Sequence, residues 1–231
     1  AHEDLPDILG RVAAVRRQLL FGAQGFDGDE VRRVAGLLGW LAEDRFEFFG
    51  YRAYEATEDS FAPIDGSGLG ILREPSPGEF HARRLGSDDH ELLVVTRDSR
   101  RSVVYRSGFL DYIGVRTFGP QGRISGEHRF LGLFAPRAFT EPLTRIPWLR
   151  ERTRQISSLI GLGESGHSAQ TAVRTLESLP HDLLFQTDPA ELAADIAAMV
   201  AVEESRRTRL FVRPGRYGRF WTCMLLLPRD R

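Results

Sequence analysis

The sequence predicts an α+β protein in which an antiparallel sheet follows N-terminal helices and precedes a helical connector and a C-terminal β-hairpin. Three observations lead to this class. Apolar residues recur at helical spacing within residues 1–45 and again within residues 136–205. Within residues 46–135, aromatic and β-branched residues gather in short runs, as they do in strands. A Gly-Pro-Gln-Gly connection inside this region is typical of a hairpin between antiparallel strands.

Two helices are predicted in residues 1–45. The first covers residues 4–20, where apolar side chains fall close to one helical face. They are Leu5, Ile8, Leu9, Val12, Val15 and Leu19. The second covers residues 29–43 and begins at Asp29, because a carboxylate at the N-cap accepts hydrogen bonds from the unpaired N–H groups of the first turn.

Strands are predicted throughout the next region. They cover residues 46–56, 68–73, 91–97, 102–106, 111–118 and 123–134. The last two are joined by residues 119–122 and form a hairpin. Its tightest register places Phe118 opposite Arg123, and successive side chains then alternate between its two faces.

The two faces of this hairpin differ in chemistry. One carries an apolar set that we expect to form the core, with the histidine buried near the edge: Ile113, Val115, Ile124, His128 and Phe130. The other carries Tyr112, Arg116, Arg123, Glu127 and Arg129. In this register Glu127 lies two residues from Arg129 and diagonally across from Arg116, near enough for charge pairing.

Tyr112, Arg116, Glu127 and Arg129 are therefore the candidate charged contact surface. Two interpretations stay open. A solvated cluster of ion pairs would contribute at most about 1 kcal/mol. A contact with a subunit or an anion would instead leave the arginines partly buried and engaged in bidentate pairs.

Helices are predicted again after Pro136. They cover residues 148–160, opened by Pro147, then 168–179 and 189–204. Asp188 followed by Pro189 is a common way for a helix to begin. Residues 206–231 predict two strands around Pro214 and Gly215, which we expect to be the truncated start of a further module.

Composition excludes several classes of function. The net charge of −1 gives no reason to expect nucleic acid or an anionic membrane as a partner. No apolar run approaches the roughly 20 residues that span a bilayer. The single cysteine favours a reducing compartment, and so a cytoplasmic location. All 31 basic residues are arginine, which excludes Schiff-base chemistry, lysine bases and a P-loop.

No catalytic, cofactor-binding or metal-binding residue is assigned. Residues 161–166 match the glycine pattern of a dinucleotide site, but a helix precedes them where that site requires a strand, so they predict a helix end and a linker. The six histidines have no metal-ligand spacing. Cys223 lies in an apolar run and is expected to be a small buried residue. A hydrolase has only scattered Ser, His and Asp residues in its favour.

Several segments of the chain resemble the N-terminal half of the large bacterial NAD-specific glutamate dehydrogenases. The similar segments are residues 37–55, 68–74, 99–115, 122–142, 146–153, 179–192 and 206–231. They occur in the order that they have in that family and cover most of the chain beyond residue 37. None of them is a catalytic signature.

The resemblance implies a non-catalytic regulatory and assembly segment. By it, residues 46–135 are a PAS-like antiparallel sheet, residues 136–205 a helical connector, and residues 206–231 the start of an ACT-like module. The parent enzyme would convert L-glutamate to 2-oxoglutarate with NAD. Its catalytic site uses lysines, which this chain lacks. Expected partners are the parent's catalytic region, sister subunits and a small-molecule effector. The alternative is a free-standing small-molecule sensor of PAS-like or ACT-like type.

Overall fold

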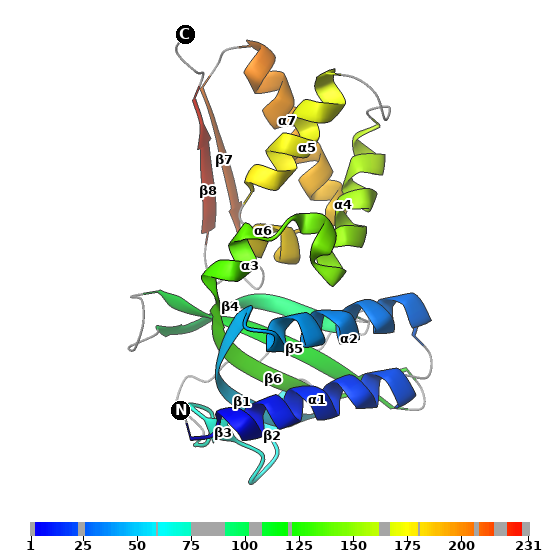
Figure 1. Ribbon diagram of the computed structural model, residues 1–231, viewed down its shortest axis with the longest axis vertical. Helices are drawn as coiled ribbons and strands as arrows, with labels where there is room; N and C mark the ends of the chain where they lie inside the picture. Colours follow the sequence, from blue (N-terminus) through cyan, green and yellow to red (C-terminus); the bar gives the residue numbers. More distant parts are fainter. Residues whose placement is uncertain are drawn as a thin grey trace. The chain divides into compact units, whose positions relative to one another are not determined.

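The computed structural model, drawn in Figure 1, divides into two compact units, Ala1–Thr140 and Glu141–Arg231. Each unit is considered by itself below. The structure describes residues 3–22, 26–58, 60–74, 91–101, 108–119, 122–161, 167–179, 181–205, 208–214 and 221–227. The predicted strand at residues 102–106 lies outside these ranges. The division of the chain into four domains stays a prediction.

Two helices open the first unit, as predicted. Helix α1 spans Leu5–Gly22 and buries Ile8, Val12, Val15 and Leu19 along one face. Helix α2 spans Gly28–Ala42. Its N-cap is Asp27 and not the predicted Asp29, because the Asp27 carboxylate accepts a hydrogen bond from the backbone N–H of Asp29.

An antiparallel sheet follows and confirms the α+β class. Its strands are β1 Phe46–Ala56, β2 Phe61–Pro63, β3 Leu69–Gly70, β4 Leu93–Arg101, β5 Phe109–Phe118 and β6 Ile124–Phe134. Within the described residues the order is β2-β1-β6-β5-β4, and β3 also pairs with β1. Strand β6 is therefore central, between β1 and β5. The predicted strand at residues 68–73 is only the two residues of β3, followed by a turn.

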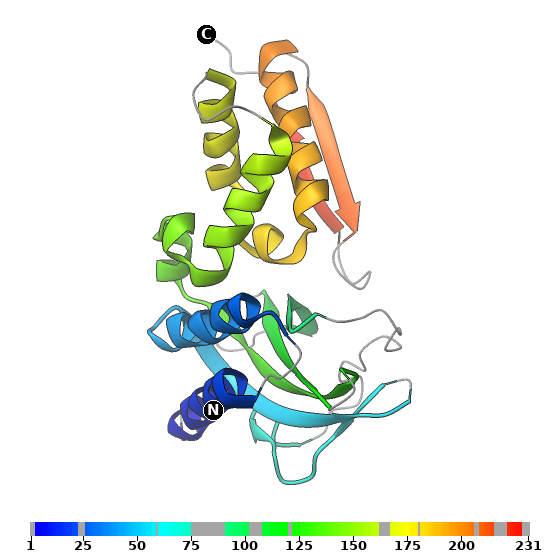
Figure 2. The ribbon, with the colours of Figure 1, turned by 90° about the vertical axis from the view of Figure 1, so that its right-hand side faces the viewer.

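Helices α1 and α2 lie on one side of this sheet, as Figure 2 shows. The sheet face beneath them contains Ile113, Val115 and Phe130, which are completely buried. The prediction that this face of the hairpin forms the core is thereby confirmed for these three residues. His128 shares the face but is only partly buried, and it lies on the central strand.

The register of β5 with β6 differs from the predicted one. Arg116 pairs directly with Glu127, and a register shift after Thr117 brings Phe118 opposite Ile124 instead of Arg123. Before that shift the pairing has moved by two residues. A movement of two residues keeps side chains on their faces, so the predicted grouping survives for residues 111–117 of β5 and 126–132 of β6.

The second unit combines helices with a hairpin. Helix α3 (Pro136–Thr140) ends the first unit. After a short 3-10 turn (Leu143–Arg145), the elements of the second unit are α4 Pro147–Ile160, α5 His167–Ser178, α6 His181–Gln186, α7 Pro189–Ser205, β7 Arg209–Pro214 and β8 Trp221–Leu226. Helix α7 packs against α4 and α5 and buries Leu192, Ile196 and Met199. The hairpin of β7 and β8 runs beside α7 in Figures 1 and 2.

Candidate functional site

Glu127 is the centre of a polar cluster on the sheet face that turns away from α1 and α2. Strand β6 places it between Arg116 of β5 and Tyr54 of β1. Arg129 follows two residues later on the same face, and Tyr112 precedes Arg116 by four residues on β5. The structure therefore brings together all four residues of the candidate charged surface.

The carboxylate of Glu127 accepts hydrogen bonds from three of its neighbours. The Nε of Arg129 donates to its Oε1 at 2.7 Å, and the Nε of Arg116 lies 3.5 Å from its Oε2. The hydroxyl of Tyr112 also donates to Oε1. Two strands thus share one carboxylate, which ties β5 to β6 through side chains as well as through the backbone ladder.

Arg129 is enclosed by aromatic rings as well as paired with an acid. Its guanidinium carbon lies 3.7 Å from the ring centroid of Tyr54, 5.3 Å from that of Phe61 and 5.7 Å from that of Tyr112. Burial acts to lower the pKa of Arg129, but Tyr112, Glu127 and Tyr54 outweigh it and raise that pKa above its ordinary value. The guanidinium therefore stays charged inside the fold.

Of the two interpretations of this face, the solvated cluster of ion pairs is wrong. Tyr112, Arg116, Glu127 and Arg129 are only 1–3% exposed. Segments that were not expected to meet this face cover it: β2 brings the ring of Phe61 over Arg129, and the Nη2 of Arg52 donates to the carbonyl of Arg73 at 2.6 Å. Arg52, Tyr54 and Phe61 belong to the cluster and were not identified from the sequence.

A glycine makes room for the pair of Tyr112 and Glu127. A Cβ atom placed on Gly114 would lie 2.9 Å from the Tyr112 ring and 3.1 Å from the Glu127 carboxyl carbon. Any larger residue at this position would push the two groups apart. The cluster contains no Ser, Cys or His, so its chemistry is that of a buried ion-pair network and not of a nucleophile with a base.

His128 lies on the opposite face, under α1. Its Nδ1 is 2.8 Å from the hydroxyl of Tyr51, and the two rings are stacked. Burial and the nearby charge of Arg11 lower the pKa of His128, and Glu127 opposes them only in part. The adjacent cavity of about 60 Å³, between Leu19 and Val115, is too small for a metabolite.

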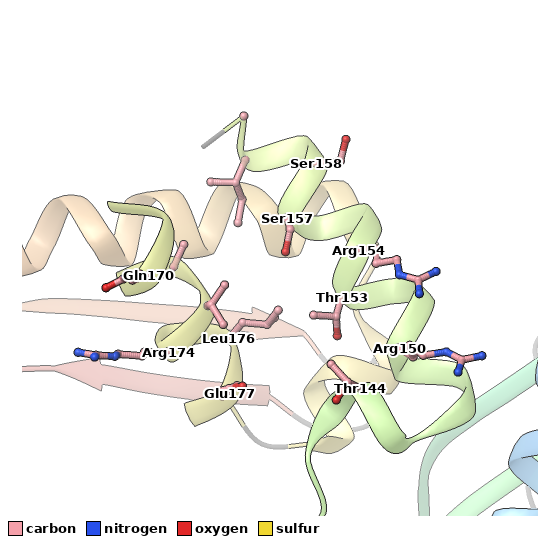
Figure 3. Close-up of a pocket in the computed structure, with 14 residues that line it drawn as sticks. Thr144, Arg150, Thr153, Arg154, Ser157, Ser158, Gln170, Arg174, Leu176 and Glu177 are labelled. Carbon is pink, nitrogen blue, oxygen red and sulfur yellow. The ribbon is translucent and has the colours of Figure 1, made fainter. Parts of the chain in front are cut away.

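A larger groove lies between α4 and α5, with a volume of about 1050 Å³. In Figure 3, Thr153 and Ser157 of α4 face the space toward Leu176 of α5. Arg150 extends from the α4 side and Arg174 from the α5 side. The groove therefore has a floor of hydroxyl and apolar groups with arginines at its margins, and its size suits a small molecule.

The remaining motifs can now be placed. Gly161 ends α4 in the left-handed conformation, with φ 67°; residues 162–166 of the glycine pattern lie outside the described ranges. Cys223 is exposed, so the prediction that it is buried is wrong. In the described part of the chain no three His, Cys, Asp or Glu side chains are grouped to hold a metal ion. None of the described helices is long and apolar enough to cross a membrane.

Comparison with known proteins shows which proteins are similar to this chain in sequence. Residues 146–205 match the family model described as glutamate dehydrogenase, helical motif 1. The NAD-specific glutamate dehydrogenase of Halomonas elongata is 32% identical over 218 residues, which are 88% of this chain and 13% of that protein. The enzymes of the same name from Pseudomonas aeruginosa and Mycobacterium tuberculosis are 29% and 28% identical over 87% and 89% of this chain, and it spans 13% and 12% of their lengths.

Proposed function

The chain is related along most of its length to a segment of the NAD-specific glutamate dehydrogenases, and from this premise we propose that it is a non-catalytic regulatory and assembly segment of such an enzyme. The whole enzyme would oxidise L-glutamate to 2-oxoglutarate with NAD. This segment would bind sister subunits and the catalytic region. It would not itself hold NAD.

The extent of the match is the observation that carries this proposal. Between 87% and 89% of the chain aligns with each of the three relatives, yet it spans only 12–13% of their lengths. Most of the length of each relative lies outside the aligned segment and is available for its catalytic site. The chain also contains no lysine, so it offers no ammonium group to bind or activate glutamate.

We assign the first unit as PAS-like and the hairpin of β7 and β8 as the start of an ACT-like module. The antiparallel sheet, with β6 at its centre and two helices on one face, supports the first assignment. The groove between α4 and α5 is where we place the site of a small-molecule effector, because it is the right size and has arginines at its margins.

We predict that the 231-residue chain produces no NADH from glutamate and NAD. Absorbance at high protein concentration measures this, and a known glutamate dehydrogenase in the same cuvette serves as the positive control. Turnover that depends on glutamate, scales with the concentration of this chain and persists through repurification would overturn the proposal. The expected result reflects the absence of lysine and the position of Gly161 at a helix end, where no dinucleotide fold precedes it.

A further inference from the structure

The groove between α4 and α5 exists because both helices use α7 as their support. Each of them has more contact with α7 than with the other. Ile156 of α4 and Leu176 of α5 are both only 1% exposed, so the apolar stripe of each helix is buried within the second unit. The adjoining faces of α4 and α5 are left to line a groove of about 1050 Å³.

Helical spacing decides which side chains form the two walls of this groove. On α4 they recur at positions i, i+4 and i+7 from Arg150, and on α5 they recur at the same spacing from Gln170. The floor between these rows includes Ala172 and Leu176, which are buried. The groove therefore has two polar walls over an apolar floor.

The charged groups of the groove are mainly cationic. Among the described residues that line it, three are arginines and one is Glu177. Arg154 pairs with Glu151 at 3.1 Å, but Arg150 and Arg174 form no ion pair with any described residue. These two extend from opposite walls in Figure 3. Each wall therefore offers a guanidinium group, which matches the oxygens of a carboxylate or a phosphate.

The middle of the groove offers little to a polar ligand group. The Thr153 hydroxyl already donates to the carbonyl of Leu149 at 2.7 Å, so its proton is not available to a ligand. Ser157 contributes a hydroxyl that faces the space in Figure 3. The described lining residues include no aromatic side chain, so stacking does not favour a ligand with a ring. A hydrocarbon segment suits this floor best.

We propose that the groove binds an elongated small molecule with an oxyanion at each end and a hydrocarbon segment between the ends. The two oxyanions would pair with Arg150 and Arg174, and the hydrocarbon would lie on the apolar floor. The volume of the groove is at the upper end for small-molecule sites, which favours an elongated ligand over a compact one. Dicarboxylates and bisphosphates share this chemistry. The inference rests on the effector role proposed above for the groove and names the chemical class of that effector.

Saturation-transfer NMR of the 231-residue chain tests the proposal, because this method detects weak binding. The probes are α,ω-dicarboxylates from succinate to suberate, each compared with the monocarboxylate of the same length. At the best length the dicarboxylate should bind about fivefold more tightly than its monocarboxylate, the upper range for one additional exposed ion pair. The alkanediol bisphosphate of that length is titrated next. Tighter binding of either dianion supports the site and identifies the oxyanion that the arginines prefer.

Substitutions separate the groove from the rest of the surface. Arg150→Gln and Arg174→Gln should each raise the Kd of the dicarboxylate to that of the monocarboxylate. Arg17→Gln is the matched control, because Arg17 is also an exposed helical arginine without an ion pair among the described residues, and it should keep the preference. Ser157→Leu fills the groove without a change of charge and should weaken the binding of both probes. Circular dichroism checks that each variant is folded.

Two results would overturn the proposal. In the first, no dicarboxylate of the series binds more tightly than its monocarboxylate. In the second, Arg150→Gln and Arg174→Gln both keep the wild-type preference, because the dianions would then bind elsewhere. Either result would leave the assembly role untouched. Production of NADH from glutamate would overturn the proposed function but would leave these affinities unchanged, so the two proposals fail separately.

Discussion

A carboxylate buried in a sheet loses its bound water. For Glu127, hydrogen bonds from Tyr112, Arg116 and Arg129 take the place of that water. Such a network has two consequences. Its net contribution to stability is modest, because desolvation of the charges offsets much of their attraction. Its disruption is expensive, because the remaining charges stay buried. We therefore expect Glu127 to contribute more to the choice of partner strand and register than to net stability.

We predict that Glu127→Gln lowers the free energy of unfolding by about 3 kcal/mol, toward the lower end of the 3–5 kcal/mol typical of broken buried pairs. The substitution keeps the shape of the side chain but removes the negative charge that two buried arginines share. Urea unfolding followed by circular dichroism measures the change. Glu43→Gln is the control: its 3.1 Å distance to Arg45 falls between the 2.7 Å and 3.5 Å distances from Glu127 to its two arginines, but Glu43 is 70% exposed. A loss of about 1 kcal/mol or less is expected there. Equal effects of the two substitutions would contradict the buried network.

His128 makes a second prediction at this scale, about pH. Its pKa in the folded protein lies below its ordinary value of 6.5, so the unfolded chain binds the proton more readily. Stability must therefore fall as the pH decreases through 6.5 and toward the lowered value, because protonation favours unfolding. Thermal midpoints of the wild type at pH 7.5 and pH 5.5 should show this fall, and His128→Gln should reduce it. A variant with the same pH dependence as the wild type would show that other groups are responsible.

At the scale of elements, long segments with strong local patterns were predictable. Strand β1 begins and ends where the aromatic run predicts, and Pro147 and Pro189 open α4 and α7 as expected. The elements that were missed are β2, α3, the 3-10 turn and α6, and each has only three to six residues. Segments this short do not contain enough residues for a periodic spacing of hydrophobic side chains to be recognised. Their conformation is decided by packing against distant parts of the chain.

The candidate site was predictable in its members but not in its burial. Alternation along β5 and β6 groups Arg116, Glu127 and Arg129 on one face in either register, because the two registers differ by two residues. The burial depends on Phe61 and Arg73, which reach this face from other segments. Nothing in the pattern of the hairpin itself indicates that such a cover exists, so the charged residues resembled a solvated surface.

The C-terminus of α4 provides a prediction for an element. Gly161 adopts φ 67° and ψ 13°, and no atom would obstruct an added Cβ, so the cost of a side chain there is conformational alone. Gly161→Ala should lower the free energy of unfolding by about 1 kcal/mol. Gly161→Asn should cost less, because asparagine tolerates this conformation better. The same urea titration measures both, and an alanine variant as stable as the wild type would contradict the αL cap.

At the scale of the whole chain, two units each have their own buried core. The first depends on the sheet, with α1 and α2 on one face and the Glu127 cluster on the other. The second depends on α7, which packs against α4 and α5. The match to helical motif 1 falls entirely within the second unit, whereas the longer alignments extend over both. Each unit thus has a distinct architecture inside one related segment.

The exposed hairpin of β7 and β8 also gives the chain an intrinsic fluorescent probe. Trp221 of β8 is 67% exposed, whereas Trp40 of α2 is buried and only 6% exposed. An indole in water emits at longer wavelength than one in an apolar environment. Covering the hairpin must therefore shift the emission of Trp221 to the blue and leave that of Trp40 in place. The emission wavelength, followed during dilution or titration without any label, would report how fully the hairpin of β7 and β8 is covered, whatever molecule covers it.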